Sequence, residues 1–236
     1  MTKQKTRAPR NRTLTILDSE KDKKMPKIKH PAKYSDVLLP IFDRYLPDDN
    51  HKILDPFAGT GKLKQIRPNC TLLEIEPEWA NLSSAVIGDA TAMPFDDACF
   101  DAVCTSPTYG NRMADSFQDH QVDKKYKRNT YRHTLGRKLS DNNSGGMQWG
   151  EKYKTLHLMA WSECFRVLKN GGIFILNISD HIRKGKIIEV TKWHIDTLAE
   201  VGFVEKEHIK CETKRQRFGK NGSLRVGYES IVVFNK

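Results

Sequence analysis

Two short segments, about fifty residues apart, carry residue types that could bind a small ligand and do chemistry on it. The first is Asp-Pro-Phe-Ala-Gly-Thr-Gly over residues 55–61, and the second is Ser-Pro-Thr-Tyr-Gly over residues 106–110. Each follows an apolar run typical of a buried strand. The glycines of the first segment would let a nucleotide-like ligand approach the backbone. The second segment places a hydroxyl, a proline and an aromatic ring at a strand end. The pair favours a cofactor with a planar substrate beside it.

The spacing of the first segment, the glycine turn, argues against two other nucleotide sites. A phosphate-binding loop ending at Gly61-Lys62 would need glycine at position 56 and serine or threonine at position 63, where the chain has proline and leucine. The dinucleotide fingerprint would need its third glycine at position 64, which is lysine.

Acidic residues end the next two expected strands. Glu74 lies nineteen residues after Asp55, where a carboxylate can accept both hydroxyls of a ribose. Asp89 ends the following strand and could accept a hydrogen bond from an adenine amino group, while Ile75 could cover one adenine face. Taken singly, each acid is typical of a loop or cap. Three acids at successive strand ends indicate a nucleoside site.

Helical and strand patterns alternate along the chain. This order predicts an α/β fold with a mostly parallel, doubly wound sheet of seven strands that ends in an antiparallel hairpin. Helices are expected over residues 30–46, directly after the glycine turn, from Pro77, over 151–168 with an end at Asn170-Gly171-Gly172, and over 187–201. Strands are expected at 53–54, 70–75, 85–89, 100–105, 173–177, 204–210 and 226–235.

The expected organisation is a basic N-terminal arm over residues 1–28 and a single domain over 29–236, with an irregular insertion at 110–150 as the candidate for substrate recognition. Five cysteines without a C-x-x-C pair favour a reduced, cytoplasmic protein without a metal site. No apolar run approaches the ~20 residues of a membrane span. The basic N-terminus lacks the apolar stretch of a secretory signal.

Positive charge is concentrated in three segments. Of a formal net charge of +11, residues 1–29, 111–139 and 210–225 carry +7, +5 and +5, so the rest of the chain is net acidic. Charged runs are often solvated surface, but this distribution favours a polyanionic partner, with nucleic acid first. Cations for phosphates and tyrosine for base stacking are expected at Arg112, Lys124, Lys125, Lys127, Arg128, Tyr131, Arg132, Lys214, Arg215 and Arg217.

The glycine turn and its acids resemble those of class I S-adenosylmethionine-dependent methyltransferases, and the turn is close to the form found in DNA amino-methyltransferases. The resemblance implies a Rossmann-like fold and S-adenosylmethionine as cofactor, with S-adenosylhomocysteine as product. It implies that Glu74 binds the ribose and that Asp89 contacts the adenine. The stretch His-Pro-Ala-Lys-Tyr at 30–34 is similar to the motif flanking the methionine end of the cofactor, and it also fits a plain helix start. The implied cofactor-binding residues are Asp55, Phe57, Gly59, Gly61, Glu74, Ile75, Asp89, Ala90 and Lys33.

The second segment, the catalytic turn, resembles the tetrapeptide Asp/Asn/Ser-Pro-Pro-Tyr of enzymes that methylate exocyclic amino groups. Such a nitrogen is a poor nucleophile because its lone pair is delocalised into the ring. Hydrogen bonds from its N–H groups to Ser106 and to a backbone carbonyl at Pro107 would favour a reactive nitrogen, and Tyr109 would stack on the base. Ser106, Pro107 and Tyr109 are therefore the expected catalytic residues. Thr108 replaces the usual second proline, which predicts a less rigid turn.

These resemblances imply methylation of a flipped-out base in DNA, with serine favouring cytosine N4 over adenine N6. Two alternatives remain open. Some RNA methyltransferases of the guanosine-N2 type resemble the chain in both motifs. A methyltransferase-like nucleic-acid-binding subunit without catalysis is the other, because Thr108 departs from the family pattern.

Overall fold

The computed structural model describes residues 34–110, 131–213, 224 and 226–236. The expected arm, Lys33 and the insertion up to residue 130 lie outside the described residues. No helix within the described ranges is both long and apolar enough to span a membrane.

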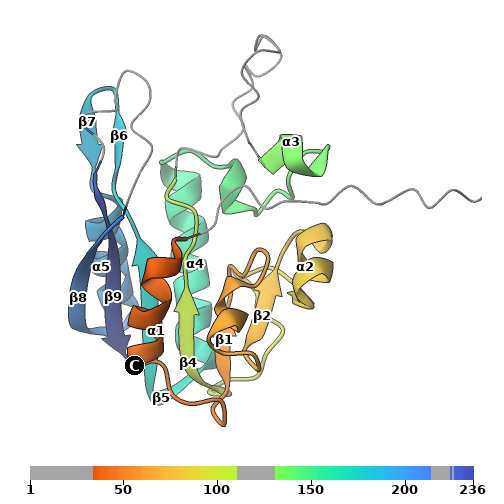
Figure 1. Cartoon of the computed structure of the whole chain (residues 1–236). Coiled ribbons are helices and arrows are strands. Elements are labelled where there is room, and N and C mark those ends of the chain that lie inside the picture. Colours follow the sequence, from red (N-terminus) through yellow and green to blue (C-terminus); the bar gives the residue numbers. More distant parts are fainter. Residues whose placement is uncertain (1–33, 111–130, 214–223, 225) are drawn as a thin grey trace, which may run out of the picture.

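A seven-stranded sheet forms the centre of the protein, in the order β3-β2-β1-β4-β5-β9-β8 (Figure 1). Neighbouring strands pair in parallel from β3 to β5, and β9 is antiparallel to both β5 and β8. The predicted fold is therefore confirmed. The strands are β1 (Ile53–Asp55), β2 (Thr71–Glu74), β3 (Val86–Ile87), β4 (Phe100–Thr105), β5 (Leu168–Ile178), β8 (Val204–Glu212) and β9 (Tyr228–Asn235).

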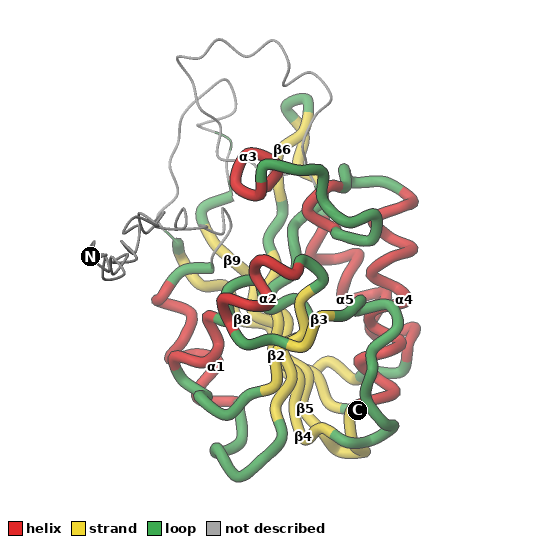
Figure 2. The backbone as a smooth tube through the Cα atoms, turned by 90° about the vertical axis from the view of Figure 1, so that its right-hand side faces the viewer, coloured by secondary structure: helices red, strands yellow, loops and turns green. Residues whose placement is uncertain are grey.

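Helices cover both faces of this sheet. Figure 2 shows α1 on one side and α4 and α5 on the other. The helices are α1 (Leu39–Tyr45), α2 (Pro77–Ser83), α3 (Tyr131–Leu135), α4 (Glu151–Val167) and α5 (Val190–Val201), with 3₁₀ turns at Asp36–Leu38, Lys62–Gln65 and Ser144–Gly146.

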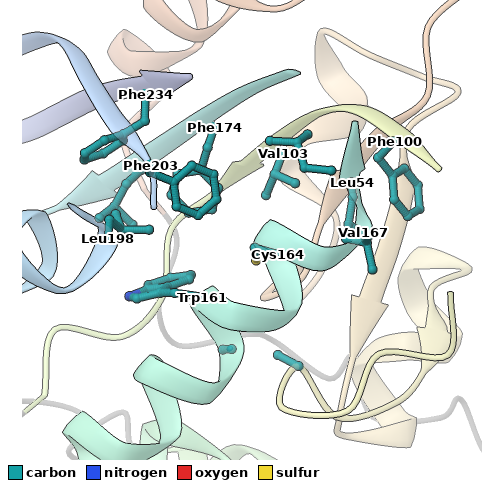
Figure 3. Close-up of a cluster of buried hydrophobic side chains, with 14 of the residues drawn as sticks. Leu54, Phe100, Val103, Trp161, Cys164, Val167, Phe174, Leu198, Phe203 and Phe234 are labelled. Carbon is teal, nitrogen blue, oxygen red and sulfur yellow. The ribbon is translucent and has the colours of Figure 1, made fainter. Parts of the chain in front are cut away.

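The alternation of side chains along the strands produces two cores. Val103 and Phe174 face α4, where Trp161 and Cys164 meet them, and Phe234 of β9 joins the same cluster (Figure 3). The opposite core packs side chains of α1 against the other face, with Leu38, Phe42, Leu72, Cys104, Ile175 and Ile231 among its members. The sheet is therefore fixed from both sides, and its strand ends can hold side chains in a defined arrangement.

Four expected elements differ in the structure. The helix expected over 30–46 is shorter in its described part: Ser35 is extended, the 3₁₀ turn begins at Asp36, and α1 begins at Leu39. The helix after the glycine turn is only the 3₁₀ turn Lys62–Gln65, because Pro68 and the start of β2 follow directly. The stretch at 170–172 does not end α4; the backbone becomes extended at Leu168, which pairs with Phe100. An antiparallel hairpin of β6 (His181–Arg183) and β7 (Lys186–Ile188) precedes the last helix. The first two residues of the expected helix, Ile187 and Ile188, belong to β7, so α5 begins at Val190.

Candidate active site

The glycine turn leaves β1 at a buried carboxylate. Asp55 Oδ1 accepts hydrogen bonds from the Phe57 backbone N–H (3.1 Å) and from Thr105 Oγ1 (2.8 Å). Burial raises the pKa of Asp55 to about 6, and these hydrogen bonds offset part of the increase. Since Thr105 ends β4, Asp55 joins the glycine turn to the start of the catalytic turn.

The turn itself requires glycine. Gly59 and Gly61 have positive φ angles of 53° and 72°. A Cβ atom on Gly61 would lie 2.7 Å from Leu72 Cδ1 and 2.9 Å from Ser83 Cβ. The backbone at Gly61 therefore packs directly on β2 and α2. The sequence pattern predicted close approach of a ligand at these glycines, whereas at Gly61 the close contacts come from the protein itself.

Glu74 ends β2 and accepts a hydrogen bond from the glycine turn. Its Oε2 accepts the Gly59 N–H at 2.8 Å, and its Oε1 accepts the Glu76 N–H at 2.9 Å. Burial raises the pKa of Glu74 to about 7, because the two N–H donors only partly compensate for lost solvation and because Glu76 and Asp55 add negative charge nearby. Each carboxylate oxygen keeps a second lone pair that could accept a ribose hydroxyl.

Asp89 follows β3 and is engaged on both oxygens. Thr91 donates its backbone N–H and its hydroxyl to Asp89 Oδ1, each at 2.8 Å. Asn142 Nδ2 donates to Oδ2 at 2.6 Å from a segment fifty-three residues away. The expected adenine acceptor is thus already held by a distant loop.

Smaller members of the expected cofactor site lie at the same edge of the sheet. Ala90 is buried and Ile75 is half-buried. The half-buried Phe57 ring stacks on His157 of α4, with centroids 5.5 Å apart and planes at 17°. Acids at the ends of β1, β2 and β3, with a glycine turn beside them, supply the donor and acceptor set that an adenosyl group requires.

The catalytic turn is held by a polar network that reaches two other strands. Asn177 Nδ2, at the end of β5, lies 3.1 Å from Ser106 Oγ, 3.2 Å from Tyr109 Oη and 2.8 Å from Glu229 Oε2. Tyr109 donates its hydroxyl to the same Glu229 oxygen at 3.0 Å. Asn177 is fully buried, and its Oδ1 accepts no hydrogen bond from the described residues.

Thr108 is fixed by hydrogen bonds. Its hydroxyl donates to Ser144 Oγ at 2.9 Å, and its carbonyl accepts the Tyr153 hydroxyl at 2.6 Å. The expectation of a less rigid turn rested on the missing second proline. In the structure, these bonds restrain the backbone from both sides.

A directional hydrogen-bond chain lies behind Tyr153. The Trp161 indole can only donate, so His194 Nδ1 accepts its N–H at 3.0 Å. Burial lowers the pKa of His194 well below its usual value, so the ring is neutral and Nε2 carries the proton. Nε2 lies 2.9 Å from the Tyr153 hydroxyl and donates to it. Tyr153 is then left to donate to Thr108, so the chain ends on the catalytic turn.

A segment that we call the bridge, residues 137–144, connects the cofactor acids to this turn. It contributes Asn142 to Asp89 and Ser144 to Thr108. Its main anchor is Glu76, a fully buried carboxylate. The donors to Glu76 are Arg137 Nη2 (2.6 Å), Ser140 N (2.8 Å), Ser140 Oγ (3.2 Å) and Asn143 Nδ2 (2.8 Å).

Only two of the expected nucleic-acid contacts fall on described residues. Arg132 belongs to α3. Tyr131 is 2% exposed, and its ring packs edge-on against Trp79 with centroids 5.5 Å apart. The expectation that Tyr131 stacks on bases is therefore wrong, because the ring belongs to a small core under the bridge. The remaining expected contacts, at 112–128 and 214–217, lie outside the described residues.

Sequence reasoning missed several residues of this site. Glu229 lies just before the apolar run of residues 231–234. The antiparallel direction of β9 brings it to the carboxyl ends of β4 and β5. Neither Glu76 nor His194 was among the expected site residues. Their roles depend on contacts with residues far along the chain.

Comparisons with known proteins agree with this geometry. A DNA methylase family model, which groups N6 and N4 methyltransferases, matches residues 100–236. No curated protein sequence matches significantly. Similar solved structures include a methyltransferase from Methanosarcina mazei (14% identity, TM-score 0.51, covering 84% of this chain and 97% of that one). Another is the [4+2]-cyclase SpnF, with 14% identity and a TM-score of 0.54, covering 85% of this chain and 80% of that one. A third is geranyl diphosphate methyltransferase in complex with GPP and sinefungin, with 10% identity and a TM-score of 0.52, covering 84% of this chain and 77% of that one.

At these identities the solved structures establish the fold alone. The family match extends over more than half of the chain and includes the catalytic turn, Asn177 and Glu229. The glycine turn lies before the matched region and completes the arrangement. The chain therefore belongs to the DNA methylase family, and it is an S-adenosylmethionine-dependent methyltransferase.

Proposed function

We propose that this methyltransferase modifies an exocyclic amino group of a DNA base, with cytosine N4 favoured over adenine N6. The observation that carries the proposal is the Ser106 hydroxyl, which Asn177 holds at 3.1 Å beside the Tyr109 ring. Asp55 and Thr105 tie this turn to the glycine turn, so cofactor and target sites adjoin. We further propose that residues 29–236 act as one domain, and that residues 111–130 and the arm contact DNA.

S-adenosylmethionine supplies an electrophilic methyl group on a sulfonium centre. The residues of the chain position the nucleophile. A serine hydroxyl has two lone pairs. If Asn177 Nδ2 uses one, the other accepts an N–H of the target amino group. The Pro107 carbonyl takes the second N–H, and the two bonds draw the amino group toward a pyramidal, nucleophilic form.

With the amino nitrogen held by Ser106 and Pro107, the bond from methyl to sulfur would break as the bond to nitrogen forms. The nitrogen becomes positively charged and acidic enough to release its extra proton to water, so the turn needs no strong base.

Catalysis by this chain, as opposed to binding alone, is supported by the way Thr108 is held. Its hydroxyl and carbonyl contacts to Ser144 and Tyr153 replace the restraint of a second proline. A target base cannot reach the turn from inside a duplex, so the proposal includes extrusion of the base.

The direct test is mass spectrometry of nucleosides after incubation of the protein and labelled cofactor with duplex DNA, single-stranded DNA or transfer RNA. We expect labelled N4-methylcytosine from DNA, and its loss in Ser106→Ala and Tyr109→Ala. Label found only in guanosine of transfer RNA would replace DNA by RNA as substrate. Cofactor binding without any labelled nucleoside would indicate the binding subunit.

Cofactor affinity is expected to depend on pH through Glu74. Its pKa of about 7 in the free protein means that the carboxylate, the better ribose acceptor, forms between pH 6 and 8. Affinity measured by calorimetry should therefore rise about tenfold over this interval. Because the folded pKa lies above the usual 4.5, the same ionisation should lower the stability of the cofactor-free protein as pH rises from about 4.5 to 7. Glu74→Gln should bind weakly and without this rise; a wild-type affinity independent of pH contradicts the assignment.

The hydrogen-bond chain predicts a defect in turnover for Tyr153→Phe. This variant keeps the ring but leaves the Thr108 carbonyl and His194 Nε2 without their described partner. We expect kcat to fall about tenfold from misplacement of the turn, with cofactor affinity unchanged. Tyr45→Phe is the matched control, since it removes a tyrosine hydroxyl that binds Glu207 away from the site. Equal kcat values in the two variants would show that these hydrogen bonds do not affect turnover.

A further inference from the structure

The β6–β7 hairpin stands apart from the main sheet. It forms a two-stranded sheet of its own, closed by Lys184 and Gly185 with φ angles of 50° and 75°. Two positive φ angles are typical of a type I′ turn, which matches the twist of the strands. Figure 1 shows the hairpin projecting beyond the end toward which β4 points, the end that carries the catalytic turn.

The hairpin is connected to the catalytic turn through Trp149. His181 is 7% exposed and lies edge-on to the Trp149 ring, with centroids 6.4 Å apart. Arg183 Nη1 donates to the Trp149 carbonyl at 3.3 Å. The same indole packs against Gly110, where a Cβ atom would lie 3.1 Å from Trp149 Cε3. Gly110 directly follows Tyr109, so the hairpin has a defined position relative to the target site.

The tip of the hairpin is strongly basic. Arg183, Lys184 and Lys186 are exposed, and no acid lies among residues 183–186. Within the described part of the chain, no carboxylate forms an ion pair with any of the three. Exposed lysines elsewhere do find acids: Lys169 pairs with Asp101 and Lys192 with Asp196. The tip therefore presents positive charge that no acid of the described residues neutralises.

We propose that this tip binds the phosphate backbone of DNA beside the target base. The inference rests on the proposed function and adds a contact surface to it. Phosphate contacts fix the register of a protein on nucleic acid without reading sequence. A rigid cationic hairpin next to the turn would hold the strand while the extruded base occupies the site.

The test is DNA binding by the triple variant Arg183→Gln, Lys184→Gln and Lys186→Gln. Anisotropy with a labelled 20-base-pair duplex and S-adenosylhomocysteine is measured from 50 to 200 mM KCl. Each lost phosphate contact should reduce the slope of log K against log salt by about 0.9. We expect a slope change of about 2–3 and binding weakened about ten- to hundredfold, with unchanged cofactor affinity. The charge-preserving variant Lys184→Arg, Lys186→Arg should bind like wild type.

The matched control removes three exposed cations near the opposite edge of the sheet, in Arg44→Gln, Lys52→Gln and Lys206→Gln. None of the three forms an ion pair with a described acid. An equal loss in this control would reduce the effect to overall charge and overturn the proposal. A triple variant with wild-type slope and affinity would also overturn it, while methylation of DNA by the wild type would still support the proposed function. Failure of the wild type to bind or methylate DNA refutes both. If the triple variant loses more affinity for duplex RNA than for duplex DNA, the tip would bind RNA rather than DNA.

Discussion

Replacing Asn177 with leucine is expected to lower the rate of methyl transfer to DNA by about 10²- to 10³-fold. The leucine has a similar volume but cannot donate to Ser106 or to Glu229, which Asn177 Nδ2 approaches at 3.1 and 2.8 Å. The serine would lose its fixed orientation, and a buried carboxylate would lose a donor. The measurement is single-turnover methylation at saturating DNA and cofactor.

Asn235→Leu is the control for this variant. Asn235 lies on β9, at the opposite end of the same β5–β9 ladder, where it pairs with Ile173. We expect its rate to stay within about twofold of wild type. Cofactor affinity should be unchanged in both variants. A leucine variant at 177 that keeps wild-type turnover would remove the network from the proposed mechanism, and a joint loss of cofactor binding would indicate general damage to the fold.

Replacing Glu76 with glutamine is expected to have the largest effect on stability. The four donors to this fully buried carboxylate come from the bridge. A glutamine offers one acceptor oxygen and turns an NH₂ group toward donors, so hydrogen bonds are lost and charge on Arg137 loses a partner. We expect the free energy of unfolding to fall by about 2–4 kcal/mol. Cofactor affinity should fall as well, because the bridge holds Asp89 through Asn142.

Glu78→Gln provides the comparison, since Arg137 Nε also donates to Glu78 Oε1 at 2.8 Å. The Glu78 side chain is 32% exposed, against 0% for Glu76. A partly solvated pair contributes less than about 1 kcal/mol. Thermal unfolding and calorimetry with S-adenosylmethionine separate the two variants. An equal decrease in the free energy of unfolding in both variants would show that burial of Glu76 does not determine how strongly it stabilises the bridge.

The bridge also changes the interpretation of the insertion at 110–150. This segment was expected to recognise the substrate. Its described part contacts one of the expected cofactor acids, Asp89, through Asn142. Asn143 donates to the buried Glu76, and Ser144 binds Thr108 of the catalytic turn. Tyr131 packs beneath it rather than toward a base. Occupancy of the cofactor site and the geometry of the target turn therefore share one structural element.

The sequence alone determined the sheet and the placement of Asp55, Glu74, Asp89 and Ser106 at its carboxyl edge. These follow from local patterns, because parallel strands bring their ends to one edge whatever lies between them. The contacts that tune the site could not be read in the same way. Glu229 reaches Asn177 and Tyr109 because β9 runs antiparallel to β5. His194 reaches Tyr153, which donates to the Thr108 carbonyl, because α5 packs on α4.

The two opening segments show the same division. Gly59 and Gly61 are needed for the backbone conformation of the turn, so their types and spacing carried the signal. Thr108 appeared to weaken the second segment when judged by its own side chain. Only the folded chain supplies Ser144 and Tyr153 to hold it, since hydrogen bonds between distant residues depend on packing rather than on local sequence.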